Sequence, residues 1–571
     1  MQRIGHVAAL AVFATTLVLA SPAGAAQAPG VATFPVGPSV VVHTDQPGGL
    51  RVGVARPDGG AVLAGPDVGE TAFLARTGEH RAILLVGVRR DGTRDPAFGD
   101  RGVTRIVLPY RVAGGPWPHV VLRDRAGRVL VVFGTGTRPD TEDRLDVMRV
   151  GRRGTIDRSY GERGFAHTGL VGSCGLEGCR RAALGRGDAL VVTGRDPAGG
   201  WAVTRLTPDG VPDVMYGLGG TAALGGGGQN GDALVLAPDG AVVVLGSGFP
   251  FGSGSLSFTR LTRLTPTGAV DPTFHAGEPV SVPQGDGSDL VARPDGKLDV
   301  LVGLSVIRFL PDGARDPAFG DDGFAAPAQI PQPPQSGIPG TRWAVWLLTT
   351  GAGRELVVEV GSPEPPDPGH ARIVVQDLGD GRSAGPVVRS IVPVGGGTSF
   401  AELPDGPALA PLVQSGFVGG RPIVRPGGGL FVPGTVSALQ SRRSVPPVHR
   451  EQVIVGVTST GRLDRTVGGP ARPARLRATV PVRRASASAI AVDVIASGPG
   501  LASIAVGGRG LLLADATVAV LRAGRQRLLV PPTPAGRHLL LHAHRLHITV
   551  DVQFRDLVGQ GAHVTARGTL R

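Results

Sequence analysis

The stretch Asp-Pro-Ala-Phe-Gly-Asp-Arg-Gly at residues 95–102 decides the fold, because close copies of it recur along the chain. It returns as Asp-Arg-Ser-Tyr-Gly-Glu-Arg-Gly at 157–164, as Asp-Val-Met-Tyr-Gly-Leu-Gly-Gly at 213–220 and as Asp-Pro-Ala-Phe-Gly-Asp-Asp-Gly at 316–323. Shorter copies begin at Asp271 and Asp464. A phrase that returns at intervals of roughly fifty residues indicates an array of one supersecondary unit.

The phrase has the composition of a short turn that links one unit to the next. Asp95 can accept hydrogen bonds from the N–H groups of the turn, Pro96 suits its first position, and Gly99 can end it in the left-handed conformation. Phe98 supplies a large apolar ring. The equivalent rings of the later copies are Tyr160, Tyr216, Phe274 and Phe319. We expect all five rings to be buried between units.

Hairpin signals give the content of each unit. Asp-Gly and related turns between Val- and Leu-rich runs predict about four antiparallel strands per unit. These turns stand at 57–59, 125–127, 185–188, 238–240, 294–296, 351–353 and 426–428, with one degenerate unit around 343–394. Seven such units predict an all-β fold, a seven-bladed β-propeller, in which closure of the ring removes exposed sheet edges. An open β-solenoid is the alternative.

Two motifs carry a family resemblance. Pro-Asp-Gly-Lys-Leu at 294–298 and the longer Arg-Leu-Thr-Pro-Asp-Gly to Tyr-Gly-Leu-Gly-Gly at 205–220 resemble the delta-60 repeat family. The resemblance covers about residues 50–469. It implies a bacterial exported or surface protein that forms a propeller, in a family without established enzymatic residues. Val467 stands where the other copies have an aromatic residue, so the closing unit departs most from the pattern.

The ends of the chain differ from its middle. Residues 1–25 combine Arg3, an apolar run and a small-residue cleavage site, which is typical of a secretory signal peptide; a retained membrane anchor is the alternative. We therefore expect a secreted or cell-surface protein with no membrane span after cleavage. The repeat propeller is assigned to 40–469 and a linker to 470–475. Alternating apolar stretches in 476–571 predict a C-terminal immunoglobulin-like β-sandwich of about seven strands.

Charge limits the classes of partner that we expect, and the cysteine content bears on disulfide and metal sites. The formal net charge of +12 comes almost wholly from arginine and is spread among 46 acidic residues, so no nucleic-acid partner is expected, whereas attraction to an anionic cell-envelope polymer is retained. Cys174 and Cys179 are the two cysteines of the chain. In an exported protein a local disulfide between them is favoured over a metal site, which would need four ligands.

No motif predicts catalysis, a cofactor or a metal site. Gly-Arg-Ser-Ala-Gly at 381–385 fits a hydrolase pattern but lies between strand-like runs. The histidines 538, 542, 544 and 547 cluster near the C-terminus. On an expected strand spanning 541–550, His542 and His544 share a face and His547 lies on the other. The sequence thus predicts an exported, non-enzymatic binding or scaffolding module for an unknown protein or cell-envelope polymer. The alternatives are a propeller hydrolase or lyase with its site on the central-channel face, and a passive spacer.

Overall fold

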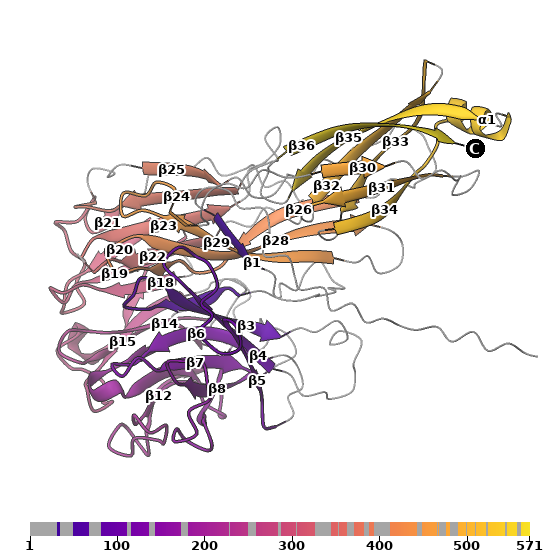
Figure 1. The fold of residues 1–571 in the computed structure, drawn as a ribbon. Helices are drawn as coiled ribbons and strands as arrows, with labels where there is room; N and C mark the ends of the chain where they lie inside the picture. Colours follow the sequence, from indigo (N-terminus) through magenta and orange to yellow (C-terminus); the bar gives the residue numbers. More distant parts are fainter. Residues whose placement is uncertain are drawn as a thin grey trace, which may run out of the picture.

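The computed structural model is built almost entirely of β-strands (Figure 1). It describes residues 31–34, 50–67, 82–110, 116–135, 143–172, 181–227, 229–248, 258–283, 287–303, 305–325, 344–351, 353–361, 371–381, 387–392, 412–441, 448–464, 466–467, 476–479, 489–497, 500–508, 510–520, 524–542, 545–556 and 561–570. Within these residues no helix is long and apolar enough to cross a membrane.

The repeat-containing part folds into antiparallel sheets that follow one another along the chain. Unit 1 contains β2 (Val52–Ala55), β3 (Ala61–Asp67), β4 (Ala82–Val88) and β5 (Val103–Val107). Unit 2 contains β6 (Trp117–Arg123), β7 (Val129–Gly134), β8 (Asp143–Val150) and β9 (Phe165–Gly172). Unit 3 contains β10 (Ala182–Leu184), the 3-10 turn η1 (Arg186–Asp188), β11 (Leu190–Arg195), β12 (Gly200–Leu206) and β13 (Thr221–Gly227). Units 2 and 3 join into one eight-stranded sheet through the pairing of β9 with β11.

The later units repeat the same four-stranded order. Unit 4 contains β14 (Gln229–Leu236), β15 (Val242–Gly248), β16 (Phe258–Leu264), the 3-10 turn η2 (His275–Gly277) and β17 (Val280–Val282). Unit 5 contains β18 (Gly287–Ala292), β19 (Leu298–Val302), β20 (Ser305–Phe309) and β21 (Phe324–Ala325). Unit 6 contains β22 (Ala344–Thr349), β23 (Glu355–Gly361), β24 (Ala371–Asp377) and β25 (Val387–Val392), so the degenerate stretch does form a sheet.

The last unit draws a strand from the N-terminal region. Unit 7 contains β26 (Leu412–Gly419), β27 (Ile423–Val424), β28 (Leu430–Ser441) and β29 (Val448–Val457). Its outer edge is completed by β1 (Val31–Phe34), which pairs with β29 in the register Val31 to Val455. This strand lies ahead of residue 40, where the sequence assigned the start of the repeat region. A strand from near one end of the chain therefore closes the sheet formed near the other end.

Contacts between neighbouring units include their first strands. Contacts run from β2 to β6, from β6 to β10, from β10 to β14, from β14 to β18 and from β18 to β22, and continue from β23 to β26. The short strand β27 in turn contacts β2. The sequence of contacts thus returns to its starting point. Apolar side chains of two neighbouring units share each core cluster, as Val52 and Val131 do between units 1 and 2.

The recurring phrase joins each unit to the next, as the sequence predicts. All five predicted rings are buried; Tyr160, for example, is 0 % exposed. The Tyr160 ring lies against Gly210 of the following unit, where an added Cβ would come within 2.7 Å of the ring. Asp157 accepts from the Ser159 N–H at 3.2 Å, which is the expected capping of the turn. A glycine follows four of the five rings and has a positive φ, +49° at Gly161, whereas His275 takes this position after Phe274 with the same φ.

An arginine fixes the phrase from its own unit. The Arg149 Nε donates to Asp157 at 2.9 Å, and the guanidinium lies 4.5 Å from the centre of the Tyr160 ring. Arg205 repeats both contacts on Asp213, at 2.8 Å, and on Tyr216, at 4.5 Å. These partly buried ion pairs and ring contacts hold the turn in one orientation relative to its own unit.

Residues 476–570 form two further sheets with one common core. One sheet contains β30 (Leu476–Thr479), β31 (Ile490–Ala496) and β34 (Gly524–Val530). The other contains β32 (Gly500–Gly508), β33 (Leu511–Val520), β35 (Leu546–Asp556) and β36 (Gly561–Leu570). Side chains from both sheets, such as Val492 and Ile504, belong to the same buried cluster. In Figure 1 these strands lie to one side of the repeat sheets.

One element of this C-terminal part differs from the prediction. The expected strand over 541–550 is wrong at its start, because Pro534–His542 form the helix α1 and β35 begins at Leu546. The Thr533 hydroxyl caps the helix by accepting a hydrogen bond from the Gly536 N–H at 3.0 Å. Leu540 is buried in the core. Thr533 followed by Pro534 is a helix-start signal that strand periodicity in the neighbouring residues obscured.

Candidate functional site in the groove between units 1 and 2

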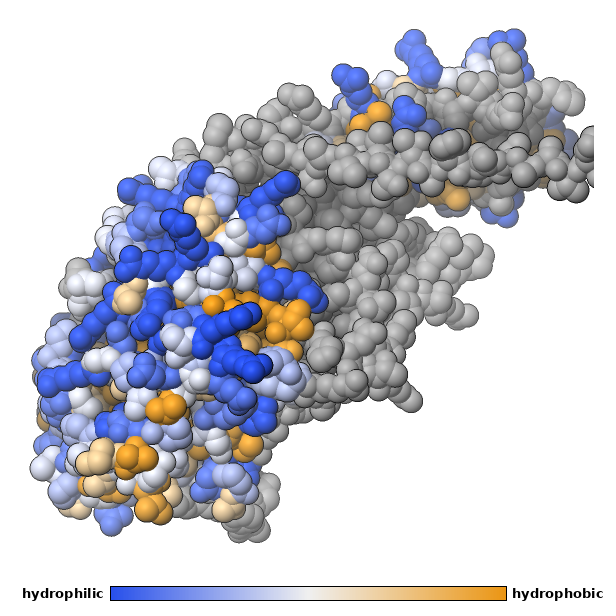
Figure 2. All heavy atoms as spheres, turned by 60° about the horizontal axis from the view of Figure 1, so that its bottom comes forward, coloured by the Kyte–Doolittle hydropathy of each residue, from blue (hydrophilic) through white to orange (hydrophobic). Residues whose placement is uncertain are grey.

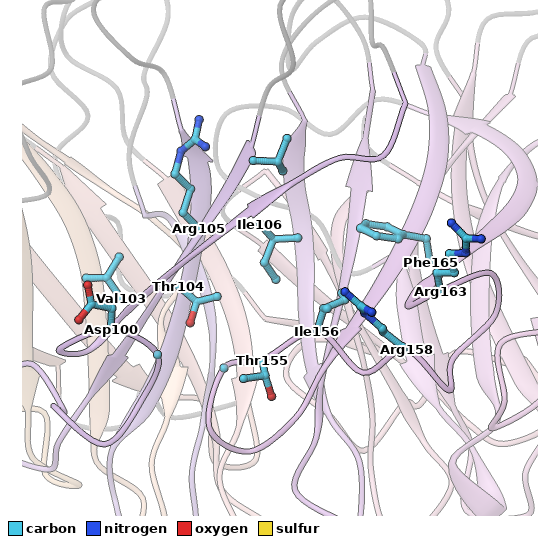
Figure 3. A pocket seen from close by; sticks show the side chains of 13 residues that line it. Asp100, Val103, Thr104, Arg105, Ile106, Thr155, Ile156, Arg158, Arg163 and Phe165 are labelled. Carbon is cyan, nitrogen blue, oxygen red and sulfur yellow. The ribbon is translucent and has the colours of Figure 1, made fainter.

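A groove of about 980 Å³ lies between the outer strands of units 1 and 2. One wall is β5, from Val103 to Val107, and the other is formed by the phrase of unit 2 and the start of β9. Figure 3 shows Arg105 and Ile106 on the first wall, Phe165 and Arg163 on the second, and Ile156 between them. The floor is therefore apolar, because Val103, Ile106, Ile156 and Phe165 all line it.

The rim of the groove is strongly basic. Arg105, Arg158 and Arg163 line it and are exposed, and Asp100 is the single acidic residue among the lining side chains. Three cations against one anion over an apolar floor favour a ligand that carries negative charge together with apolar surface. The space-filling view shows orange apolar residues within a mainly blue, hydrophilic surface on one face of the molecule (Figure 2).

A polar cluster adjoins this groove. Asp146 on β8 is fully buried and accepts from the Tyr110 hydroxyl at 2.5 Å and from Arg144 Nη2 at 2.9 Å. Its other oxygen lies 2.7 Å from Nδ1 of His167. Tyr110 packs edge-on against Phe165, with ring centres 6.3 Å apart, and so connects the cluster to the groove wall. Residues from the exit of unit 1 and from two strands of unit 2 thus meet at one carboxylate.

The contacts within the cluster determine which of its atoms donate hydrogen bonds and which accept them. Burial and then the negative charge of Asp146 raise the pKa of Tyr110 far above its usual range, so its hydroxyl stays a donor. An ionised carboxylate only accepts hydrogen bonds, so we assign the proton of His167 to Nδ1. The Nε2 atom is then left as an acceptor on a residue that is exposed at the surface. The arrangement can bind a donor group at this atom.

Other buried polar groups have structural roles near the first strands. Asp289 on β18 accepts from Arg421 Nη2 at 2.6 Å and from the Leu347 N–H at 3.0 Å, which links units 5, 6 and 7. His119 lies in the irregular register of β6, and its Nδ1 has no hydrogen-bond partner among the described residues. Burial, followed by the positive charge of Arg181, lowers the pKa of His119 to about 3. It is therefore neutral at ordinary pH.

The residues singled out by the sequence do not meet in this groove. Cys174 and Cys179 lie outside the described residues, as does Ser383 of the hydrolase-like pattern. His538 and His542 stack on each other in α1, with ring centres 4.4 Å apart. Over the described part of the chain, no group of three or more His, Cys, Asp or Glu residues has the arrangement of a metal site.

The residues of the polar cluster gave no motif in the sequence. Tyr110, Asp146 and His167 are far apart in the chain. The one local signal is Asp146 itself, a charged residue in the middle of the strand-forming run 143–150. A buried charge in a strand requires partners, but the sequence does not say which residues supply them.

Comparisons with known proteins support the repeat architecture. The family model described as "Domain of unknown function (DUF5122) beta-propeller" matches residues 237–274, which span the hairpin turn after β14 to the phrase of unit 4. A search of curated proteins found no match.

The solved structures that match this chain have low identity and low similarity scores. A gluconolactonase from Xanthomonas campestris is 17% identical, covering 59% of this chain and 95% of its own, with a TM-score of 0.28. An α-L-arabinofuranosidase from Fusarium graminearum is 13% identical, covering 64% and 98%, with a TM-score of 0.33. Drosophila Semaphorin 1a, extracellular domains 1–2, is 10% identical, covering 74% and 88%, with a TM-score of 0.33. The strand content and the family match together identify a chain that contains a propeller-type repeat.

Proposed function

We propose that the mature protein is an exported, non-enzymatic, seven-bladed β-propeller that binds an anionic partner in the groove between its first two blades. An immunoglobulin-like β-sandwich at 476–571 follows the propeller after the linker 470–475. The delta-60 repeat family is the resemblance on which this reading first rested. The groove, with its apolar floor and three arginines against one aspartate, is the single observation that carries the binding function.

The blade count rests on the strand groups and their contacts. Units 1 to 7 have the strand content of seven blades, and β27 contacts β2 so that the series can close on itself. Pairing of β1 with β29 supplies the last blade with a strand from the N-terminal region and so joins the two ends of the repeat series. For the C-terminal part, two antiparallel sheets of seven strands around one core support the sandwich reading.

The partner class follows from the charge of the groove. Acidic groups on an unknown protein or on a cell-envelope polymer would pair with Arg158 and Arg163. Apolar parts of the partner would cover Val107, which is exposed, and the half-buried Ile156. Apolar burial contributes about 25 cal/mol per Å² of covered surface, and the arginines add orientation and salt-sensitive attraction. The expected complex therefore weakens as ionic strength rises.

Binding of fluorescein-labelled poly-L-glutamate tests the proposal. We expect its fluorescence anisotropy to rise with protein concentration, and the double variant Arg158→Ser/Arg163→Ser to bind at least about tenfold more weakly, since each partly buried charged contact contributes on the order of 1 kcal/mol. The control Arg525→Ser/Arg537→Ser removes the same charge from exposed positions of the C-terminal part. Equal weakening in both double variants would contradict a site in the groove.

The cellular address and the disulfide are further parts of the proposal. The secreted or cell-surface location rests on the signal peptide at 1–25, and N-terminal sequencing of exported protein should start near Ala26. A disulfide between Cys174 and Cys179 rests on that oxidising address and on their short separation. Thiol titration of non-reduced protein should then find no free sulfhydryl, and two titratable thiols would refute the bond.

One observation favours a second candidate function, a propeller hydrolase or lyase. Asp146 contacts Nδ1 of His167, as a carboxylate contacts the general-base histidine of many enzymes, and Nε2 is directed away from the carboxylate. The pair lies beside the groove, whereas the sequence reading assigned this function to the channel face. Release of p-nitrophenol from p-nitrophenyl acetate, compared between the wild type and His167→Gln, tests it. Turnover that depends on His167 would favour the enzyme, and absent or unchanged turnover would remove it.

A further inference from the structure

Unit 3 departs from the other units at the exposed positions of its phrase. Val214 is 71% exposed, Met215 is 78% exposed and Leu218 is 91% exposed, and Val211 beside them is half exposed. Leu218 stands where the other long copies have Asp100, Glu162 and Asp321. These four exposed apolar side chains lie within residues 211–218 and are called the apolar patch of unit 3. Sibling units have charged residues, proline, alanine, serine or threonine at these positions.

The neighbouring unit 2 is basic on the same turns. Arg152 and Arg153 in its hairpin turn and Arg158 and Arg163 in its phrase are all exposed, and Glu162 is the exposed acid of residues 151–164. Arg125 in the preceding turn is exposed as well. The hydrogen bond from Gly161 to the Asp209 carbonyl, at 2.6 Å, holds this basic turn directly beside the turn that carries Val211.

We propose that this combined surface, the apolar patch of unit 3 and the arginines of unit 2, docks on a membrane surface that contains anionic lipid. Apolar side chains at a loop tip can enter the boundary between headgroups and acyl chains. Adjacent arginines gain about 1 kcal/mol each from an anionic lipid surface. The proposal goes beyond the groove function. The two surfaces share Arg158 and Arg163, whereas Arg152, Arg153 and the apolar patch of unit 3 do not line the groove.

Charge and size distinguish a bilayer from a second copy of the chain. A standard interface buries about 800 Å² on each partner, which four side chains cannot supply. A symmetric contact would also bring the arginines of unit 2 close to those of the other copy, where like charges repel. A bilayer has neither problem, because a few inserted side chains and a diffuse negative charge are sufficient for reversible binding.

Vesicle sedimentation tests the docking surface. We expect the full mature chain to sediment with vesicles of phosphatidylglycerol mixed with phosphatidylcholine, and far less with phosphatidylcholine alone. Met215→Asp/Leu218→Asp should lower the partition coefficient at least about tenfold, because two apolar anchors become anions. Arg152→Glu/Arg153→Glu should lower it by a similar factor and flatten its dependence on salt. All four positions are exposed, so circular dichroism and the melting temperature should stay unchanged.

Matched controls make the result decisive. Leu541→Asp changes an apolar residue that is 62% exposed on α1, and Arg525→Glu/Arg537→Glu reverses the same charge on the C-terminal part. Both should bind as the wild type does. The proposal is overturned if controls and test variants weaken equally, or if no variant changes binding. It is also overturned if sedimentation velocity detects self-association that Met215→Asp/Leu218→Asp abolishes while vesicles are not bound.

Discussion

The Gly161 N–H donates to the Asp209 carbonyl oxygen at 2.6 Å, and this bond joins the phrase of unit 2 to the hairpin turn of unit 3. Four other phrases make the same bond to the following unit. The pairs are Gly99 with Arg153, Gly217 with Thr267, His275 with Asp312 and Gly320 with Asp380, at 2.7 to 3.0 Å. The repeat is thus defined by a joint between units as much as by the strands within each unit.

Gly161→Ala should destabilise the protein substantially. A Cβ at this position would come within 2.0 Å of the Phe165 carbonyl oxygen, and φ is +49°. We expect a loss of at least about 2 kcal/mol, measured as a lower urea midpoint. Gly169→Ala is the matched control, since φ is also positive there but no atom lies within 4 Å of the added Cβ. Equal losses in the two variants would mean that close packing at the joint contributes nothing.

His275→Gly should stabilise the protein. His275 occupies the position that the other joints give to glycine, with φ at +49°, and its N–H makes the same bond to the next unit. An L-residue other than glycine pays roughly 1 kcal/mol in this conformation. We therefore expect the urea midpoint to rise. A decrease would indicate that the contact of the His275 ring with Glu278, 3.3 Å from its carbonyl oxygen, outweighs the strain.

Tyr160→Phe should leave stability unchanged or raise it slightly. The buried Tyr160 hydroxyl has no hydrogen-bond partner among the described residues, and Phe98 and Phe319 fill the same position in other units. Removing an unpaired buried hydroxyl returns up to about 1 kcal/mol, whereas Tyr160→Ala should cost about 3–5 kcal/mol through the cavity it leaves. Thermal melts of the three proteins measure both effects. A costly Tyr160→Phe would reveal a polar partner for the hydroxyl.

Stability should fall as the pH drops below 6.5, because of His119. Its pKa is lowered from 6.5 to about 3 in the folded protein, so the unfolded chain binds the proton first. The contribution of neutral His119 to the free energy of unfolding is complete above pH 6.5. It is lost progressively toward pH 3, at about 1.4 kcal/mol per pH unit. Urea unfolding at pH 7 and pH 5 should therefore differ by roughly 2 kcal/mol. His119→Leu should remove most of that difference; an undiminished slope would assign it to other groups.

The aspartates that begin the recurring phrase should cause a second loss of stability at lower pH. Burial alone would raise the pKa of Asp157, but hydrogen bonds from Ser159 and the charge of Arg149 hold it below its usual range. The stability that these aspartates contribute is present above about pH 4 and is lost as the pH falls through their lowered pKa. Unfolding curves of Asp157→Asn should lack this component, which sets it apart from the effect of His119.

The sequence allowed the units to be predicted because their signals are local. The phrase, its ring and the hairpin glycines lie within a few residues of one another, so the strands of each unit and the burial of Tyr160 followed directly. Val467 could also be recognised as the weakest copy, yet it is fully buried with Val88 of unit 1 in a shared cluster.

The rest depends on contacts between distant residues. Pairing of Val31 with Val455 joins two stretches separated by almost the whole repeat region, and no local pattern identifies that partner. The cluster of Tyr110, Asp146 and His167 is equally non-local, because neighbouring units meet only after folding. The helix α1 was missed for another reason, since its apolar residues 539–541 fit a strand as well as a helix.

Differential scanning calorimetry of the chain from Ala26 to Gly469 tests the central claim, that the repeats form a ring closed by β1 and not by C-terminal strands. The account predicts one cooperative transition close to that of the full mature chain. Further deletion of residues 26–34, which removes β1, should lower the transition temperature clearly. Absence of a cooperative transition in the fragment to Gly469 would contradict the account, since the strands after 475 would then be needed to complete the ring.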